Sequence, residues 1–130
     1  MDEKFLDFIW DKESSKGTHP NKMATGGDYQ IKRIMYDDVN RLSKEARGKN
    51  WTYDEVINDP KKGRYYTNQA FDVVGSHYIK SYKLPDTTEI KIGIWNMGIG
   101  RVRELKGNLI TFPPIARKYI ADHQNLFGGK

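Results

Sequence analysis

One carboxylic acid, Glu13, stands where a carboxyl group could do acid-base chemistry. It closes an apolar segment, FLDFIW, spaced as a helix, and it precedes a loop rich in small polar residues. A carboxyl at the C-terminal end of a helix faces the negative end of the helix dipole, and partial burial would further favour its protonated form. A protonated carboxyl near neutral pH can act as a general acid. Glu13 is therefore the first catalytic candidate, against the common alternative of an exposed glutamate that only ends the helix.

Other reactive residue types lack the spacing that their chemistry requires. His19, His77 and His123 are far apart in the sequence and show no metal-ligand spacing. Neither Ser14 nor Ser15 belongs to a nucleophile motif with a neighbouring base. We therefore expect no metal site, no other cofactor and no covalent serine chemistry.

The charge balance favours an anionic partner. The chain holds 22 Lys and Arg residues against 17 Asp and Glu residues, a formal net charge of +5. Nucleic acid, a wall carrying teichoic acid, and peptidoglycan with its free carboxylates would all suit that charge. The basic residues are mixed with acids, however, as in KRIMYDDVNRLSKEAR, which is typical of a solvated helical face. A nucleic-acid partner is accordingly not expected.

Length and composition set the class of protein. At 130 residues the chain is expected to form one domain, residues 1–130, and to act as a monomer. It has no cysteine, which excludes a disulfide framework and a thiolate nucleophile. The first segment, MDEKFLDFIWDKE, alternates charged and apolar side chains, so we expect neither a signal peptide nor a membrane span.

Hydrophobic spacing and capping signals predict a mainly helical chain. Thr52 and Glu55 form a capping-box pattern. The segment LITF, residues 109–112, is the best candidate strand, and a small hairpin could form near the loop THPNKMATGGD. The predicted helices are residues 5–13, 31–46, 52–59, 67–82, 88–95, a short one ending near 105, and 113–126. The stretch IGIWNMGIGRVREL, residues 92–105, then places Trp95, Asn96 and Met97 at a turn between two helices.

Five segments occur in an order typical of one enzyme family. They are Glu13-Ser14-Ser15, then TGGDYQI, then YYTNQAFDVVGSHYIKSY, then IGIWNMGIGRVREL, and finally IARKYI. They resemble, in turn, the Glu-Ser pair, the GLMQI loop, the NxxxGxxYL helix, the AYNAGPGRV turn and the Tyr-bearing closing helix of the catalytic domain shared by soluble lytic transglycosylases and goose-type lysozymes. The resemblance covers residues 5–122, and NMGIGRV against NAGPGRV is its most specific part.

The resemblance implies a lysozyme-like, mainly α (α+β) fold with a cleft between a loop-rich lobe and a helical lobe. Glu13 would be the single acid/base that cleaves the β-1,4 bond between N-acetylmuramic acid and N-acetylglucosamine in peptidoglycan. In a transglycosylase the muramyl C6 hydroxyl attacks C1 and leaves a 1,6-anhydro end, whereas in a lysozyme water attacks. The substrate's 2-acetamido group can support the developing positive charge, so one carboxylate suffices.

The resemblance also implies the residues that bind the glycan strand. Gln30 would hydrogen-bond the sugar or the loop backbone, and Asn96 an N-acetyl group or backbone. Aromatic faces such as Trp95, Tyr29 and Tyr78 suit the C–H faces of pyranose rings. The full expected set is Ser14, Ser15, Tyr29, Gln30, Tyr78, Trp95, Asn96, Met97 and Tyr119.

Two departures from the family pattern bear on the chemistry. Trp95 stands where the family has a tyrosine whose hydroxyl can orient the catalytic glutamate, so Tyr78 or Tyr119 would have to supply that hydroxyl. Asp28 replaces a leucine and is a candidate second carboxylate. It is either a polar turn residue after Gly27 or a group that positions water and moves the outcome toward hydrolysis.

Three functional alternatives remain at this point. The first is a lytic transglycosylase, the second a hydrolytic lysozyme on the same bond, and the third a non-enzymatic basic module that binds nucleic acid or the wall. Without an export signal, we expect a bacteriophage enzyme, carried in the virion or released from the host cytoplasm to the wall, or a piece of a larger secretion-system protein.

Overall fold

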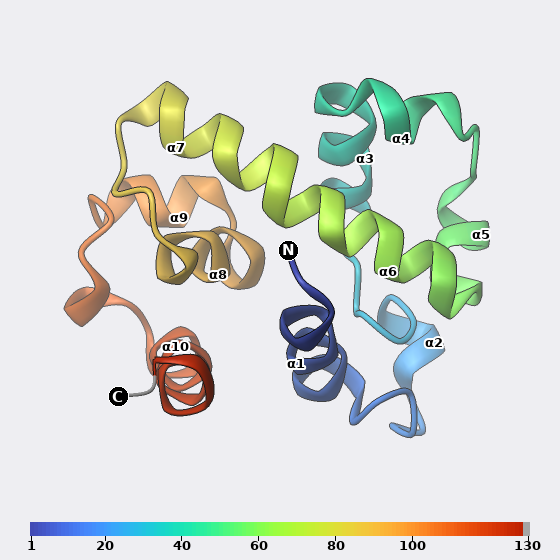
Figure 1. The fold of residues 1–130 in the computed structure, drawn as a ribbon, viewed down its shortest axis with the longest axis horizontal. Coiled ribbons are helices and arrows are strands. Elements are labelled where there is room, and N and C mark those ends of the chain that lie inside the picture. The colour runs from blue at the N-terminus through green and yellow to red at the C-terminus, as the bar shows by residue number, and fades with distance from the viewer. Residues whose placement is uncertain (129–130) are drawn as a thin grey trace. The chain divides into compact units, whose positions relative to one another are not determined.

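A computed structural model describes residues 1–128, with Ala24 described by its backbone only, and all regular structure in that range is helical (Figure 1). The prediction of a mainly α chain is confirmed. The helices are α1 Glu3–Ser14, α2 Lys22–Thr25, α3 Arg33–Leu42, α4 Lys44–Gly48, α5 Tyr53–Asn58, α6 Pro60–Gln69, a π-helix Ala70–Gly75, α7 Ser76–Tyr82, α8 Thr88–Met97, α9 Ile99–Glu104, a 3₁₀-helix Leu109–Thr111, and α10 Pro114–Phe127. No described helix is both long enough and apolar enough to cross a membrane.

The chain forms two compact units, one of residues Met1–Val74 and one that begins at Gly75. The first unit is built on α1, whose N-terminus is capped because Asp2 accepts a hydrogen bond from the Phe5 backbone N–H at 2.9 Å. The apolar stripe of α1 is buried, and the ring of Phe5 packs edge-on against Phe71 with centroids 4.9 Å apart. The first helix thus ends where the sequence predicts and buries the predicted face.

Side-chain caps set the boundaries of α3 to α6. Thr52 and Glu55 make both bonds of the capping box, at 2.8 and 3.1 Å, as predicted. The prediction of one helix over 31–46 is wrong, because Ser43 leaves helical geometry and its hydroxyl accepts from the Ala46 backbone N–H at 3.1 Å, which starts α4. Asp59, the last residue of the helix predicted over 52–59, lies after α5 and starts the next helix. Its carboxylate caps α6, with Pro60 at the first helical position.

The second unit packs α8 against α9 and α10. Gly93 makes the packing possible, because a Cβ there would lie 2.8 Å from the ring of the buried Phe112. The predicted strand over residues 109–112 is wrong. Asn108 accepts from the Ile110 backbone N–H at 3.3 Å, and the Phe112 N–H bonds the Leu109 carbonyl at 3.2 Å, so the segment closes a 3₁₀ turn.

The second unit holds a buried histidine whose protonation is linked to folding. His123 on α10 packs on Phe127 with ring centroids 4.9 Å apart, and its Nδ1 lies 3.9 Å from the Glu89 carboxylate. Burial lowers the pKa of His123 below its ordinary value of 6.5, and Glu89 opposes this only in part. The unfolded chain therefore takes up this proton at higher pH than the folded chain does.

We expect the free energy of unfolding to fall as the pH drops through the unfolded pKa of His123, and His123→Gln to reduce that fall. Urea denaturation of both proteins at about pH 7.5 and about pH 5.5 measures the difference. An equal loss of stability in parent and variant would assign the pH dependence to other groups.

Candidate functional site

Glu13 lies in the last turn of α1, and its exposure is intermediate between buried and exposed. It is followed by a sharp turn in which Ser15 and Lys16 both adopt left-handed backbone angles, with φ of 51° and 57°. The turn is held by the backbone N–H of Ser15, which donates to the Asp11 carbonyl at 2.9 Å. A carboxylate at the end of a packed helix is thus held on a rigid element.

Ser14 and Ser15, predicted beside Glu13, have different surroundings. Ser14 is 1% exposed, and its hydroxyl accepts from the Gly17 N–H at 2.8 Å and donates to the Trp10 carbonyl at 3.4 Å. Its hydroxyl therefore shapes the turn after α1. Ser15 is exposed, so its side chain is the one of the pair that faces solvent.

Asp28 is buried and bonded through both oxygens. The Trp10 indole N–H donates to Oδ2 at 2.9 Å, and Lys22 Nζ lies 2.6 Å from Oδ1. Gly17 lies against the same carboxylate, since a Cβ there would be 2.6 Å from Oδ2. Asp28 therefore joins α1, α2 and the turn between them, and positioning a water would require one of these contacts to open. Its role as second carboxylate stays a prediction.

Gln30 holds the loop backbone. Its amide nitrogen donates to the carbonyls of Lys22 and Gly27, at 3.0 and 2.8 Å, and its amide oxygen accepts from the Thr25 hydroxyl. Of the two roles expected from the sequence, sugar contact or loop support, the second is the one observed. The sugar contact stays a prediction.

Tyr29 is an interior residue of the first unit. Its side chain is 3% exposed, its ring stacks on Trp10 with centroids 6.3 Å apart, and its hydroxyl accepts from Arg64 at 2.9 Å. Burial raises the pKa of Tyr29, and the hydrogen bond from Arg64 opposes this rise. In this arrangement the ring has no exposed face for a pyranose, and it fixes the loop to α6.

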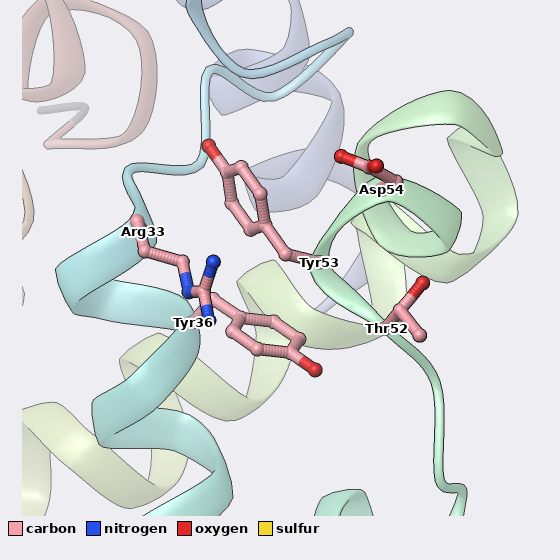
Figure 2. A pocket seen from close by; sticks show the side chains of 5 residues that line it. All are labelled: Arg33, Tyr36, Thr52, Tyr53 and Asp54. Atoms are coloured by element: carbon pink, nitrogen blue, oxygen red, sulfur yellow. The ribbon is translucent and has the colours of Figure 1, made fainter.

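A pocket of about 280 Å³ lies beside this loop, between α3 and the start of α5 (Figure 2). None of the predicted site residues lines it; its walls are Arg33, Tyr36, Thr52, Tyr53 and Asp54. The Arg33 guanidinium lies over the rings of Tyr53 and Tyr36, 5.5 and 5.7 Å from their centroids. The Tyr53 hydroxyl donates to the Ile31 carbonyl at 2.6 Å. Through this hydrogen bond, the residues that line the pocket hold the end of the loop just after Gln30.

The remaining predicted residues belong to the second unit. Trp95, Asn96 and Met97 form the last turn of α8 and are partly exposed, so the prediction that they lie in the turn is wrong, and the helix predicted to end at residue 95 continues to Met97. The chain reverses at Gly98, with φ 89°, whose N–H bonds the Ile94 carbonyl at 2.9 Å. The side chains of Tyr78 on α7 and Tyr119 on α10 are mostly buried, 9% and 5% exposed.

The predicted residues therefore form two sets. Residues 13–15 and 28–30 belong to the first unit, where Trp10 and Gly17 connect the two segments through Asp28, and Tyr78, Trp95 to Met97 and Tyr119 belong to the second. The sequence did not single out the partners that brace the first set, Trp10, Lys22 and Arg64. For Trp10 the sequence did hold a signal, because it lies three residues before Glu13 on the core side of the same helix and so near the turn that follows.

Comparison with family models, with curated proteins and with solved structures found no match to this chain.

Proposed function

We propose that this protein cleaves the β-1,4 bond between N-acetylmuramic acid and N-acetylglucosamine in peptidoglycan, with Glu13 as the only catalytic acid and base. The observation that carries the proposal is the setting of Glu13. It is a partly exposed carboxyl at the end of α1, and the residues on either side of it, Trp10 and Gly17, lie against the buried Asp28 of the loop. A general acid requires this combination of access and fixed position.

In the proposed reaction Glu13 starts protonated and gives its proton to the glycosidic oxygen as the bond to C1 of N-acetylmuramic acid breaks. The 2-acetamido group of the substrate supports the positive charge that develops at C1. The Glu13 carboxylate then takes a proton from the C6 hydroxyl of the same sugar, and that oxygen bonds to C1. The acid is regenerated, and the muramyl end leaves as a 1,6-anhydro sugar.

The state of Asp28 favours this transglycosylase outcome over hydrolysis. An inverting hydrolase needs a second carboxylate to activate water. Both oxygens of Asp28 are held, by Trp10 and Lys22, and the side chain is 7% exposed. Because Asp28 is held by these contacts, no second carboxylate is left to activate water. The C6 hydroxyl of the substrate can attack C1 with Glu13 as the only base.

The rival function is a binding module without catalysis, and its support is the net charge of +5. Clearing of cell walls distinguishes the proposed cleavage from binding without catalysis. The purified chain is expected to clear a gel cast with bacterial cell walls, and a heat-inactivated sample is the control. Absence of clearing, together with salt-sensitive retardation of DNA on a gel, would favour the rival.

A further inference from the structure

The net charge is confined to one part of the chain. Residues 1–74 hold 13 basic and 13 acidic side chains, whereas residues 75–130 hold 9 basic and 4 acidic ones. The whole formal charge of +5 therefore lies in the sequence of the second unit. A charge excess confined to one unit raises the local concentration of anions at that unit rather than around the whole molecule.

Part of this charge gathers where α7 and α9 end. The guanidinium of Arg103 on α9 lies 3.9 Å from the ring centroid of Tyr82, a residue of α7 that is 40% exposed. Lys83 follows Tyr82 directly, and Lys106 lies in the turn after α9. We call Tyr82, Lys83, Arg103 and Lys106 the basic surface.

The two lysines flank one packed junction. A Cβ on Gly107 would lie 3.3 Å from Leu84 and 3.4 Å from Pro85, so the turn after α9 rests on the loop after α7. Lys83 and Lys106, the neighbours of these contact residues, both have left-handed backbone angles and exposed side chains. The fold thus brings Lys83, Arg103 and Lys106 to the same edge of the unit.

The cations of the basic surface are not neutralised within the described residues 1–128. None of Lys83, Arg103 and Lys106 has a carboxylate oxygen within 4.0 Å in that range. Glu104 pairs with Arg101 at 2.8 Å, and Glu89 faces His123 at 3.9 Å. Asp86 in the loop after α7 lowers the local charge but pairs with none of the three. Several unneutralised cations on one edge fit a repeating anion better than a single carboxylate.

The aromatic ring at the centre points to the kind of polymer. Single-stranded nucleic acid is held largely by bases that stack on exposed aromatic rings. Here Arg103 already lies over the ring of Tyr82, which also stacks on Tyr78 with centroids 6.1 Å apart. The ring of Tyr82 is therefore largely covered by Arg103 and Tyr78 and has little face left for a base. The basic surface can then bind a polymer only through its charges. An arginine fork and two lysine ammonium groups bind phosphate oxygens without reading a base.

We propose that the basic surface binds the phosphate groups of a polyol-phosphate polymer of the teichoic-acid type, and so holds the protein on the cell wall. This binding goes beyond the proposed cleavage and does not use Glu13. Because the three cations replace counterions of the polymer, binding weakens with salt, and the value for single-stranded nucleic acid gives a slope of log affinity against log salt of about −0.7 for each phosphate neutralised. Three contacts give a slope of about −2.

The test is titration of synthetic poly(glycerol phosphate) by calorimetry at several salt concentrations. Arg103→Gln/Lys106→Gln removes two charges from the basic surface and should reduce the slope to about −0.7 and the affinity at low salt by at least about tenfold. The matched control, Arg117→Gln/Lys118→Gln on α10, removes the same number of charges from another helix and should keep the parent's slope. If the first variant unfolds, Lys83→Gln/Lys106→Gln replaces it in the same titration. This second variant also removes two charges from the basic surface but keeps the packing of Arg103 on Tyr82.

Equal losses in the two pairs of variants would overturn the proposal, because the attraction would then come from net charge alone. So would the absence of measurable binding to the polymer in the parent protein. Tighter binding of single-stranded DNA than of poly(glycerol phosphate) at equal phosphate concentration would assign the surface to nucleic acid instead. Glu13→Gln should bind the polymer as the parent does, so a failure of the proposed cleavage would leave this result unaffected.

Discussion

Glu13→Gln is expected to abolish wall clearing, with a loss of rate of at least about 10²–10⁴-fold, while the midpoint of thermal unfolding stays close to that of the parent. The amide has the same size as the carboxyl but cannot give or take the proton. Turbidity of a suspension of purified peptidoglycan measures the rate, and circular dichroism measures the unfolding midpoint.

The matched control for this variant is Asp11→Asn. Asp11 is an exposed acid two residues earlier on the same helix, and its substitution removes the same charge. It should clear walls at nearly the parent's rate. If Glu13→Gln kept activity within a few-fold of Asp11→Asn, Glu13 would not be the catalytic acid.

Gly27→Ala is expected to cause the largest loss of stability among the substitutions considered, on the order of 3 kcal/mol or more. Gly27 has φ 78°, and a Cβ there would lie 2.2 Å from the Ile57 carbonyl oxygen. The obstacle is backbone, so the loop that carries Asp28, Tyr29 and Gln30 must move away from α5. Guanidinium denaturation measures the loss, and wall clearing should fall with it.

Gly98→Ala separates backbone strain from collision. Gly98 also has a positive φ, 89°, but a Cβ there would meet no atom within 4 Å. Only backbone strain applies, because φ 89° with ψ 156° is a conformation that essentially glycine alone adopts, and the cost is about 1–3 kcal/mol. If the two variants lost the same free energy of unfolding, the close approach of Gly27 to Ile57 would not be a feature of the folded protein.

Helix boundaries set by neighbouring residues could be predicted from the sequence. The end of α1 beside Glu13, the capping box of Thr52 and Glu55 and the last helix all depend on signals within a few residues. The segment at residues 109–112 shows the limit of such reasoning. Its apolar, β-branched side chains favour a strand, but Asn108 offers its own side chain to the backbone, and a turn forms.

Contacts between distant residues could not be predicted in the same way. Asp28 was given two alternative roles because the sequence does not show that Trp10, 18 residues earlier, donates to its carboxylate. Tyr29 was expected to present an aromatic face to sugar, but its ring stacks on Trp10, 19 residues earlier, and its hydroxyl accepts from Arg64, 35 residues later. Gln30 was expected from the resemblance to bond either the sugar or the loop backbone, and its backbone partners lie within eight residues.

Mass spectrometry of the glycan fragments released from purified peptidoglycan distinguishes transglycosylase cleavage by Glu13 from hydrolysis and from the absence of cleavage. We expect fragments that end in 1,6-anhydro-N-acetylmuramic acid, lighter by one water than reducing ends, and none from Glu13→Gln. Reducing N-acetylmuramic acid ends would contradict the transglycosylase chemistry and assign the nucleophile to water. Walls that release no glycan fragments at all would contradict peptidoglycan cleavage itself.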